Sequence, residues 1–143
     1  ISKKLLLSKI EIALAGRAAE IIVFGKNEIT QCSENDISYA TNLIKEMVTK
    51  YGFSIMGPIS INEENTDLFV ADGLVRKKSL IADNTFSKID NEIINISKVS
   101  LNNSINILQK NRDLLDKLVE ILLNFETIDK TIFTKVTFDL LKL

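Results

Sequence analysis

The sequence predicts an all-α fold, a helical bundle of about five helices with one long irregular loop after the second helix. Apolar residues recur at three- and four-residue spacing in five segments, as one buried face of an α-helix requires. The only proline, Pro58, follows Gly57 inside the irregular segment, where the pair indicates a turn. We see no internal repeat, so we interpret residues 1–143 as one domain.

The first predicted helix runs from about Ser2 to Phe24. Gly25 follows it directly, at the position where a left-handed glycine commonly ends a helix. Residues 26–31 then form a short polar connection. The face expected to be buried consists of Leu6, Ile10, Ala13, Leu14, Arg17, Ile21 and Phe24.

The second predicted helix begins at Ser33, because Ser33 and Asp36 resemble a capping box with Asp in place of Glu. Gly52 fits a glycine stop at its far end. Its apolar stripe consists of Ile37, Ala40, Leu43, Ile44, Met47, Val48 and Tyr51.

Residues 52–85 form the predicted irregular loop. The alternation Ile59-Ser60-Ile61 predicts a short strand. Residues 62–67 and 76–83 are expected to be mobile, whereas the apolar run at residues 68–70 should be held in place.

Three more helices complete the predicted bundle. The third starts at Thr85, its expected N-cap, and runs towards Asn111, which caps the fourth. Either Thr127 or Asp129 caps the last. The expected inward residues are Ile89, Ile93, Ile96, Ser100, Asn103 and Ile107 in the third helix, Leu114, Leu115, Leu118, Ile121, Leu122 and Phe125 in the fourth, and Ile132, Phe133, Val136 and Leu140 in the fifth.

Composition excludes several classes of function. The net charge is −1, from 18 basic and 19 acidic residues, and no basic stripe with interleaved aromatics occurs, so we expect no nucleic-acid partner. No apolar run approaches the roughly 18 residues of a membrane-spanning helix, so membrane contact would need segments outside this sequence. Histidine is absent, which excludes any site that depends on an imidazole of this chain.

Two short clusters could carry chemistry. In residues 16–20, Gly16 indicates close packing, because glycine inside a helix costs roughly 1 kcal/mol relative to alanine. The structural interpretation is a close helix crossing with Arg17 and Glu20 solvated or paired, and the residues alone favour it.

The second cluster, residues 33–36, contains Asp36. Its carboxylate either stabilises the helix N-terminus, which the residues alone favour, or ligates a metal. The nearby Cys32 is the only cysteine, which excludes an internal disulfide. We expect Cys32 to be a small buried filler, because a nucleophilic cysteine needs a base that the chain lacks.

Five segments in order resemble the FtsH-like ATP-dependent zinc metalloproteases, specifically the C-terminal part of their peptidase domain. The first resembles the family pattern L-G-G-R-x-A-E-E-x-x-F-G and the second T-T-G-A-x-N-D. The third resembles M-V-T-x-(Y/F)-G-(M/F)-S, the fourth L-G-P and the last L-L-x-x-E-T-I-D. In this sequence the five segments are Leu14 to Gly25, Thr30 to Asp36, Met47 to Ser54, Met56 to Pro58, and Leu122 to Asp129.

The resemblance implies a membrane-anchored ring protein, expected to be hexameric, that uses ATP to unfold misfolded or unassembled proteins and a zinc peptidase to degrade them. It implies that two zinc ligands and the general-base glutamate lie upstream, in an H-E-x-x-H helix outside this chain. Asp36 would be the third zinc ligand, and Glu20 would support the site by orienting a histidine ligand. The fragment would therefore be inactive alone, with ATP and Mg bound by an ATPase domain elsewhere.

The full-length protein would lie in an organellar inner membrane of a eukaryote, mitochondrial or plastid-like, or in a bacterial plasma membrane. The sequence departs from the family pattern at Ala15, Ile21, Gln31, Cys32 and Ser33. These departures and the missing histidines keep a second hypothesis open, a non-catalytic helical assembly or scaffold module of a degenerate homologue.

Overall fold

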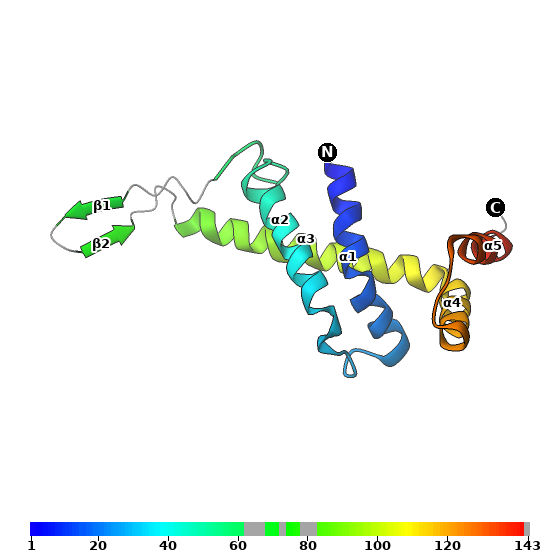
Figure 1. Ribbon diagram of the computed structural model, residues 1–143. Coiled ribbons are helices and arrows are strands. Elements are labelled where there is room, and N and C mark those ends of the chain that lie inside the picture. The colour runs from blue at the N-terminus through cyan, green and yellow to red at the C-terminus, as the bar shows by residue number, and fades with distance from the viewer. Residues whose placement is uncertain (62–67, 72–73, 78–82, 142–143) are drawn as a thin grey trace.

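The computed structural model describes residues 1–61, 68–71, 74–77 and 83–141. These residues form five α-helices, which confirms the predicted all-α fold (Figure 1). In chain order the elements are α1 (Lys3–Phe24), a 3₁₀ turn η1 (Gln31–Ser33), α2 (Glu34–Thr49), strands β1 (Leu68–Ala71) and β2 (Leu74–Lys77), α3 (Asp83–Lys110), α4 (Arg112–Phe125) and α5 (Lys130–Leu141).

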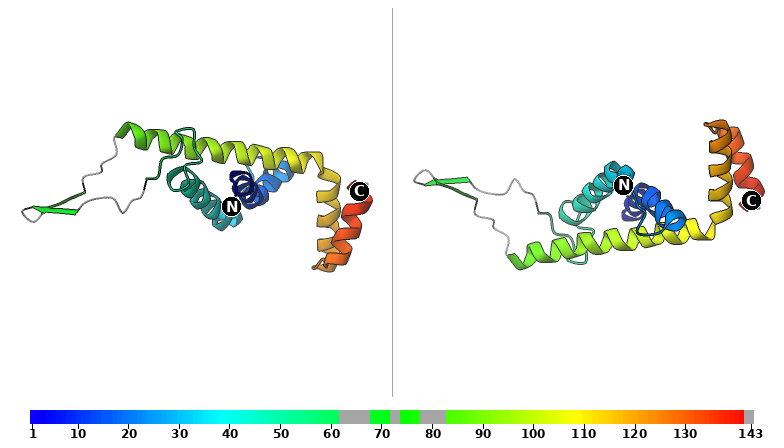
Figure 2. Two further views of the ribbon diagram at one scale, coloured as in Figure 1. Left: turned by 90° about the horizontal axis from the view of Figure 1, so that it is seen from above. Right: turned by 90° about the horizontal axis from the view of Figure 1, so that it is seen from below.

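The core is a three-helix unit. α1 and α2 run antiparallel as a hairpin and lie across one side of the long α3 (Figures 1 and 2). Their apolar stripes meet between them because residues three and four apart share one helix face. The buried core consists of Leu6, Ile10, Leu14, Ala40, Ile44, Met47, Val48 and Ile89.

The predicted ends of α1 are confirmed. The Ser2 hydroxyl accepts the Leu5 amide at 3.2 Å and caps the helix. Gly25 has φ of +88° and donates its amide to the Ile21 carbonyl at 3.1 Å. Phe24, expected on the buried face, is instead 63% exposed.

The predicted capping box at Ser33 is wrong. The Ser33 side chain makes no capping hydrogen bond to α2; it is buried and donates towards α1 instead. α2 begins one residue later, after the 3₁₀ turn, and ends at Thr49. Gly52 therefore lies three residues beyond the helix, although it does have the left-handed φ, +63°.

The loop after α2 differs from the prediction. Residues 59–61 form no strand, because the Ile61 amide donates to the Thr49 carbonyl at the end of α2, at 2.6 Å. The apolar run 68–70 instead belongs to an antiparallel hairpin, β1–β2, in which Val70 pairs with Val75. Mobility was expected for residues 62–67 and 76–83; of these, 76 and 77 belong to β2 and 83 begins α3, and the others lie outside the described residues.

Gly52 and Gly16 differ in the space that a side chain would have. A Cβ at Gly52 would lie 2.7 Å from the Pro58 Cα, whereas one at Gly16 would meet only the Ser33 hydroxyl at 3.8 Å. The close packing expected at Gly16 is therefore not present among the described residues.

We expect Gly52→Ala to destabilise the chain by about 2–3 kcal/mol, through positive-φ strain and the clash with Pro58. Gly16→Ala, the matched control, should leave stability unchanged or raise it by up to about 1 kcal/mol. Urea denaturation followed by circular dichroism measures both. Equal stability of the two variants would contradict the strain at Gly52.

α3 begins two residues before the predicted Thr85. Ile89 and Ser100 are buried as expected, but Asn103 and Ile107 are exposed, and Glu92 and Ser104 are buried in their place. The Ser104 hydroxyl donates to the Glu11 carbonyl of α1 at 2.8 Å. The buried face of α3 thus follows the crossing of α1 and α2 and departs from the apolar stripe.

α4 and α5 form a second hairpin at the end of α3 (Figure 2). Of the two candidate caps for α5, Asp129 is the one used, and it accepts the Ile132 amide at 2.8 Å. Asn111 precedes α4, but its amide donates back to the Ile107 carbonyl and does not cap. The prediction that both apolar faces point inward holds only in part, because no residue of either helix is fully buried. Phe125 is 71% exposed, whereas four predicted inward residues of α4 are half-buried, namely Leu114, Leu115, Leu118 and Ile121.

Candidate functional site

The structure brings Glu20 of α1 against the turn that leads into α2. Its carboxylate accepts hydrogen bonds from the hydroxyls of Thr30 and Ser33, the latter at 3.5 Å, and lies 3.5 Å from the Arg17 guanidinium. The Arg17 and Glu20 side chains are only 15% and 16% exposed. We call these four residues the Glu20 clasp; it ties the end of α1 to the start of α2.

Local sequence explains the clasp. Arg17 and Glu20 are three residues apart and therefore neighbours on one face of α1. The Thr30 hydroxyl also accepts the Cys32 amide at 3.3 Å, which caps the 3₁₀ turn, so one side chain starts the turn and contacts Glu20. The sequence did not identify Thr30 and Ser33 as partners of Glu20, because nothing local distinguishes a serine that caps from one that bonds to another helix.

The clasp lowers the pKa of Glu20 below its ordinary value of 4.5. The hydrogen bond from Thr30 is the largest cause, since it favours the ionised carboxylate, and Arg17 and Ser33 act in the same direction. Desolvation opposes them by favouring the neutral acid. Glu20 is therefore ionised at neutral pH.

This shift predicts a pH-dependent contribution to stability. Because the folded pKa is lowered, ionised Glu20 stabilises the fold above about pH 4.5, and that contribution is lost as the pH falls through the lowered pKa. We expect Glu20→Gln to destabilise the chain at pH 7 and to cost less at pH 3. Urea denaturation at both pH values tests this, with the exposed Glu28→Gln as control. A penalty that is the same at both pH values would contradict an ionic role.

Asp36 lies in the first turn of α2, three residues after Ser33, and is exposed. Within the described residues it forms no hydrogen bond or ion pair, so its oxygens are available to a ligand. The helix N-terminus favours its negative charge. The structure places Glu20 and Asp36 at the same α1–α2 junction without direct contact; Ser33 and its turn connect them.

A carboxylate oxygen suits zinc, but zinc is usually held by four ligands. The described residues contain no group of three His, Cys, Asp or Glu side chains placed to hold a metal. Cys32 belongs to no such group. The expectation that it is buried is wrong, because it is exposed on the 3₁₀ turn. Asp36 therefore fits a metal site only as one ligand, completed by another segment.

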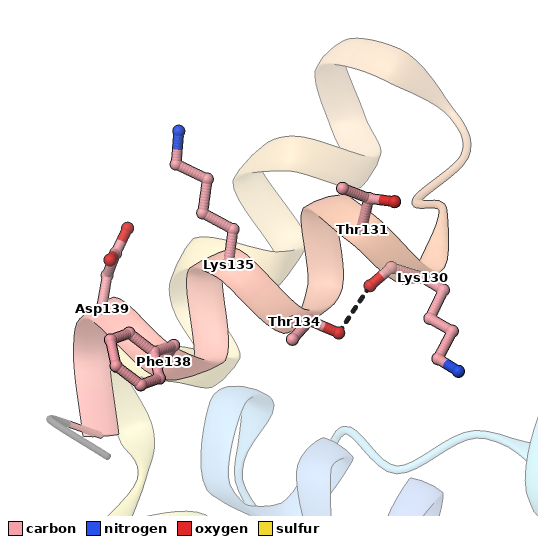
Figure 3. Close-up of a pocket in the computed structure, with 6 residues that line it drawn as sticks. All are labelled: Lys130, Thr131, Thr134, Lys135, Phe138 and Asp139. Atoms are coloured by element: carbon pink, nitrogen blue, oxygen red, sulfur yellow. Dashed lines mark hydrogen bonds between the residues drawn. The ribbon is translucent and has the colours of Figure 1, made fainter.

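A shallow hollow of about 450 Å³ lies along α5 and is distant from the clasp in sequence (Figure 3). One helix supplies all of its lining, so no second element faces it, and its Thr134 hydroxyl is already bonded to the Lys130 carbonyl at 2.7 Å. We assign it no role. No helix formed by the described residues is long and apolar enough to span a membrane.

Comparison with known proteins gives one consistent result. The model of peptidase family M41 matches residues 1–136. The ATP-dependent zinc metalloprotease FtsH of Cyanidium caldarium is 38% identical over 136 residues, 95% of this chain and 22% of that relative. The protein of the same name from Trieres chinensis is 36% identical over 129 residues, 90% of this chain and 20% of the relative. The one from Mycoplasma mobile is 35% identical over 127 residues, 89% and 18% respectively. The chain spans about one fifth of the length of these relatives.

Proposed function

This chain belongs to peptidase family M41, and we propose that residues 1–143 form the C-terminal portion of the peptidase domain of an ATP-dependent zinc metalloendopeptidase. The observation that carries the proposal is Asp36, an exposed and unpaired carboxylate on the first turn of α2, within the segment that matches the family. The helix N-terminus favours this charge without any bond, so the proposal rests on the available oxygens of Asp36 together with the family match.

Asp36 is proposed as the third zinc ligand, beside two histidines of an H-E-x-x-H helix elsewhere in the longer protein. When bound, zinc would lower the pKa of a coordinated water and so supply the nucleophile for peptide hydrolysis. This chain's own contribution is to hold the Asp36 carboxylate in place, with α2 fixed to α1 by the Glu20 clasp. The fragment alone lacks a general base and should not cleave peptides.

Glu20 is proposed to support the site in two ways. Through Thr30 and Ser33 it fixes the turn before Asp36. Each carboxylate oxygen has two lone pairs, so Glu20 retains capacity to accept a ring N–H from a histidine ligand. Such a bond would fix the histidine's orientation and raise its basicity as a ligand.

The remaining functions belong to the whole protein and are proposals. They comprise ATP and Mg binding by a separate ATPase domain, a membrane anchor, polypeptide substrates that are misfolded or unassembled, and self-association into a ring. The α4–α5 hairpin supports self-association, because it exposes large apolar side chains that a neighbouring subunit could cover, including Leu123 at 80% and Phe125 at 71%.

The exposed hairpin also favours a second candidate, an assembly or scaffold module that kept the fold and lost the chemistry. Zinc content and ATP-dependent casein cleavage of the full-length protein separate the two. We expect one zinc per subunit, cleavage that requires ATP, and loss of cleavage with a chelator. A protein that binds no zinc and cleaves nothing would establish the scaffold.

A further inference from the structure

The first turn of α2, which carries Asp36, lies outside the apolar core. Residues 34–36 are all exposed, and the first fully buried residue of α2 is Ala40. The N-cap residue, Ser33, makes no capping hydrogen bond, because its hydroxyl donates towards α1. The position of the Asp36 carboxylate therefore depends on the 3₁₀ turn η1 that leads into the helix.

Thr30 connects that turn to α1 through two consecutive hydrogen bonds. The ionised Glu20 carboxylate can only accept, so the single hydroxyl proton of Thr30 is directed to Glu20 Oε1. A lone pair of the same hydroxyl oxygen accepts the Cys32 amide at 3.3 Å, which caps η1. One hydroxyl group thereby fixes a backbone amide of the turn relative to a side chain of α1.

The far end of η1 is bonded to the same carboxylate. Ser33, the last residue of the turn, is only 6% exposed and donates to Glu20 Oε2 at 3.5 Å. That separation is longer than the roughly 2.5–3.0 Å of an ordinary O–H···O bond, so the contact is weak. The bond from Thr30, which is also the largest cause of the lowered pKa of Glu20, is therefore the main connection between the turn and α1.

We propose that Thr30 positions the Asp36 carboxylate for metal binding by fixing η1 to Glu20. Without the Thr30 hydroxyl, the turn would keep the weaker bond from Ser33, and the exposed first turn of α2 would move more freely. A metal ligand has to be held to within about 0.5 Å of its binding geometry, so this freedom lowers metal affinity. The inference rests on the proposed zinc role of Asp36, and it adds a residue that acts without touching the metal.

The zinc affinity of the full-length protein, measured by competition with a chromophoric chelator, tests the proposal. Thr30→Val keeps the branched shape and removes the hydroxyl, and it should weaken zinc binding by about 10–100-fold. Thr30→Ser retains the hydroxyl and should bind zinc as the wild type does. Ser33→Ala should weaken binding less than Thr30→Val, because the bond that it removes is longer.

Thr49→Val is the matched control, because it also removes one hydrogen-bonded threonine hydroxyl. The Thr49 hydroxyl donates to the Lys45 carbonyl at 2.7 Å, at the opposite end of α2 from Asp36. We expect this variant to retain the wild-type zinc affinity. If it weakens zinc binding as much as Thr30→Val does, the effect is a general loss of stability and the proposal is overturned.

A second measurement needs no metal. Hydrogen–deuterium exchange of the zinc-free full-length protein should be about two- to tenfold faster at the Cys32 amide in Thr30→Val, and unchanged in Thr30→Ser. Unchanged zinc affinity in Thr30→Val, beside loss of zinc in Asp36→Asn, would overturn this inference alone. A wild type that binds no zinc would overturn the proposed function and the inference with it.

Discussion

Replacing Asp36 with asparagine in the full-length protein should remove bound zinc and lower ATP-dependent casein cleavage by about a hundredfold or more, while ATP hydrolysis continues. By our proposal this chain supplies one zinc ligand, the Asp36 carboxylate, and the substitution removes its negative charge. Asparagine has nearly the same shape, and Asp36 bonds to nothing else in the described residues, so the fold should be unaffected. Metal analysis and cleavage assays measure both effects.

Glu34→Gln is the matched control for Asp36→Asn. Glu34 is an exposed acid in the same first turn of α2, so it experiences the same helix dipole. Its replacement by glutamine removes the same charge as Asp36→Asn. We expect it to retain zinc and cleavage. If both variants lose activity equally, the effect belongs to the helix N-terminus in general and Asp36 is not the ligand.

Truncating Ile44 to alanine should destabilise the chain by about 2–5 kcal/mol, the largest stability effect that we expect. Ile44 is fully buried in the core cluster where α2 meets α1 and α3, so removing its side chain loses buried apolar area and leaves a cavity. Because a domain of this size is stable by only about 5–15 kcal/mol, much of the total would be lost. The midpoint of urea denaturation measures the change.

Ile12→Ala gives the control for burial. Ile12 lies on α1 beside buried residues, but it is 74% exposed, so its truncation should alter stability by no more than about 0.5 kcal/mol. Comparable losses for the two variants would mean that this face of α1 is covered in solution, for example by a second copy.

Local sequence was sufficient for the helices and for some of their ends. Five segments with apolar residues at three- and four-residue spacing predicted five helices, because that period is set within each segment. Gly25 was predicted as the end of the first helix, and Asp129 as one of two candidate caps for the last, because such residues act on backbone groups a few positions away. The segments that resemble the family also pointed to Asp36, and the structure adds that this residue is exposed.

Tertiary contacts decided which side chains are buried and which partners they bond. Ser33 bonds to a carboxylate 13 residues away instead of capping its own helix, and Glu92 is buried against an amide 37 residues away. No residue of α4 or α5 is fully buried, although their apolar pattern resembles that of the buried helices. Periodicity establishes that a helix has an apolar face, but which face is covered depends on how helices cross. That crossing is set by packing among segments far apart in the chain, which no local pattern encodes.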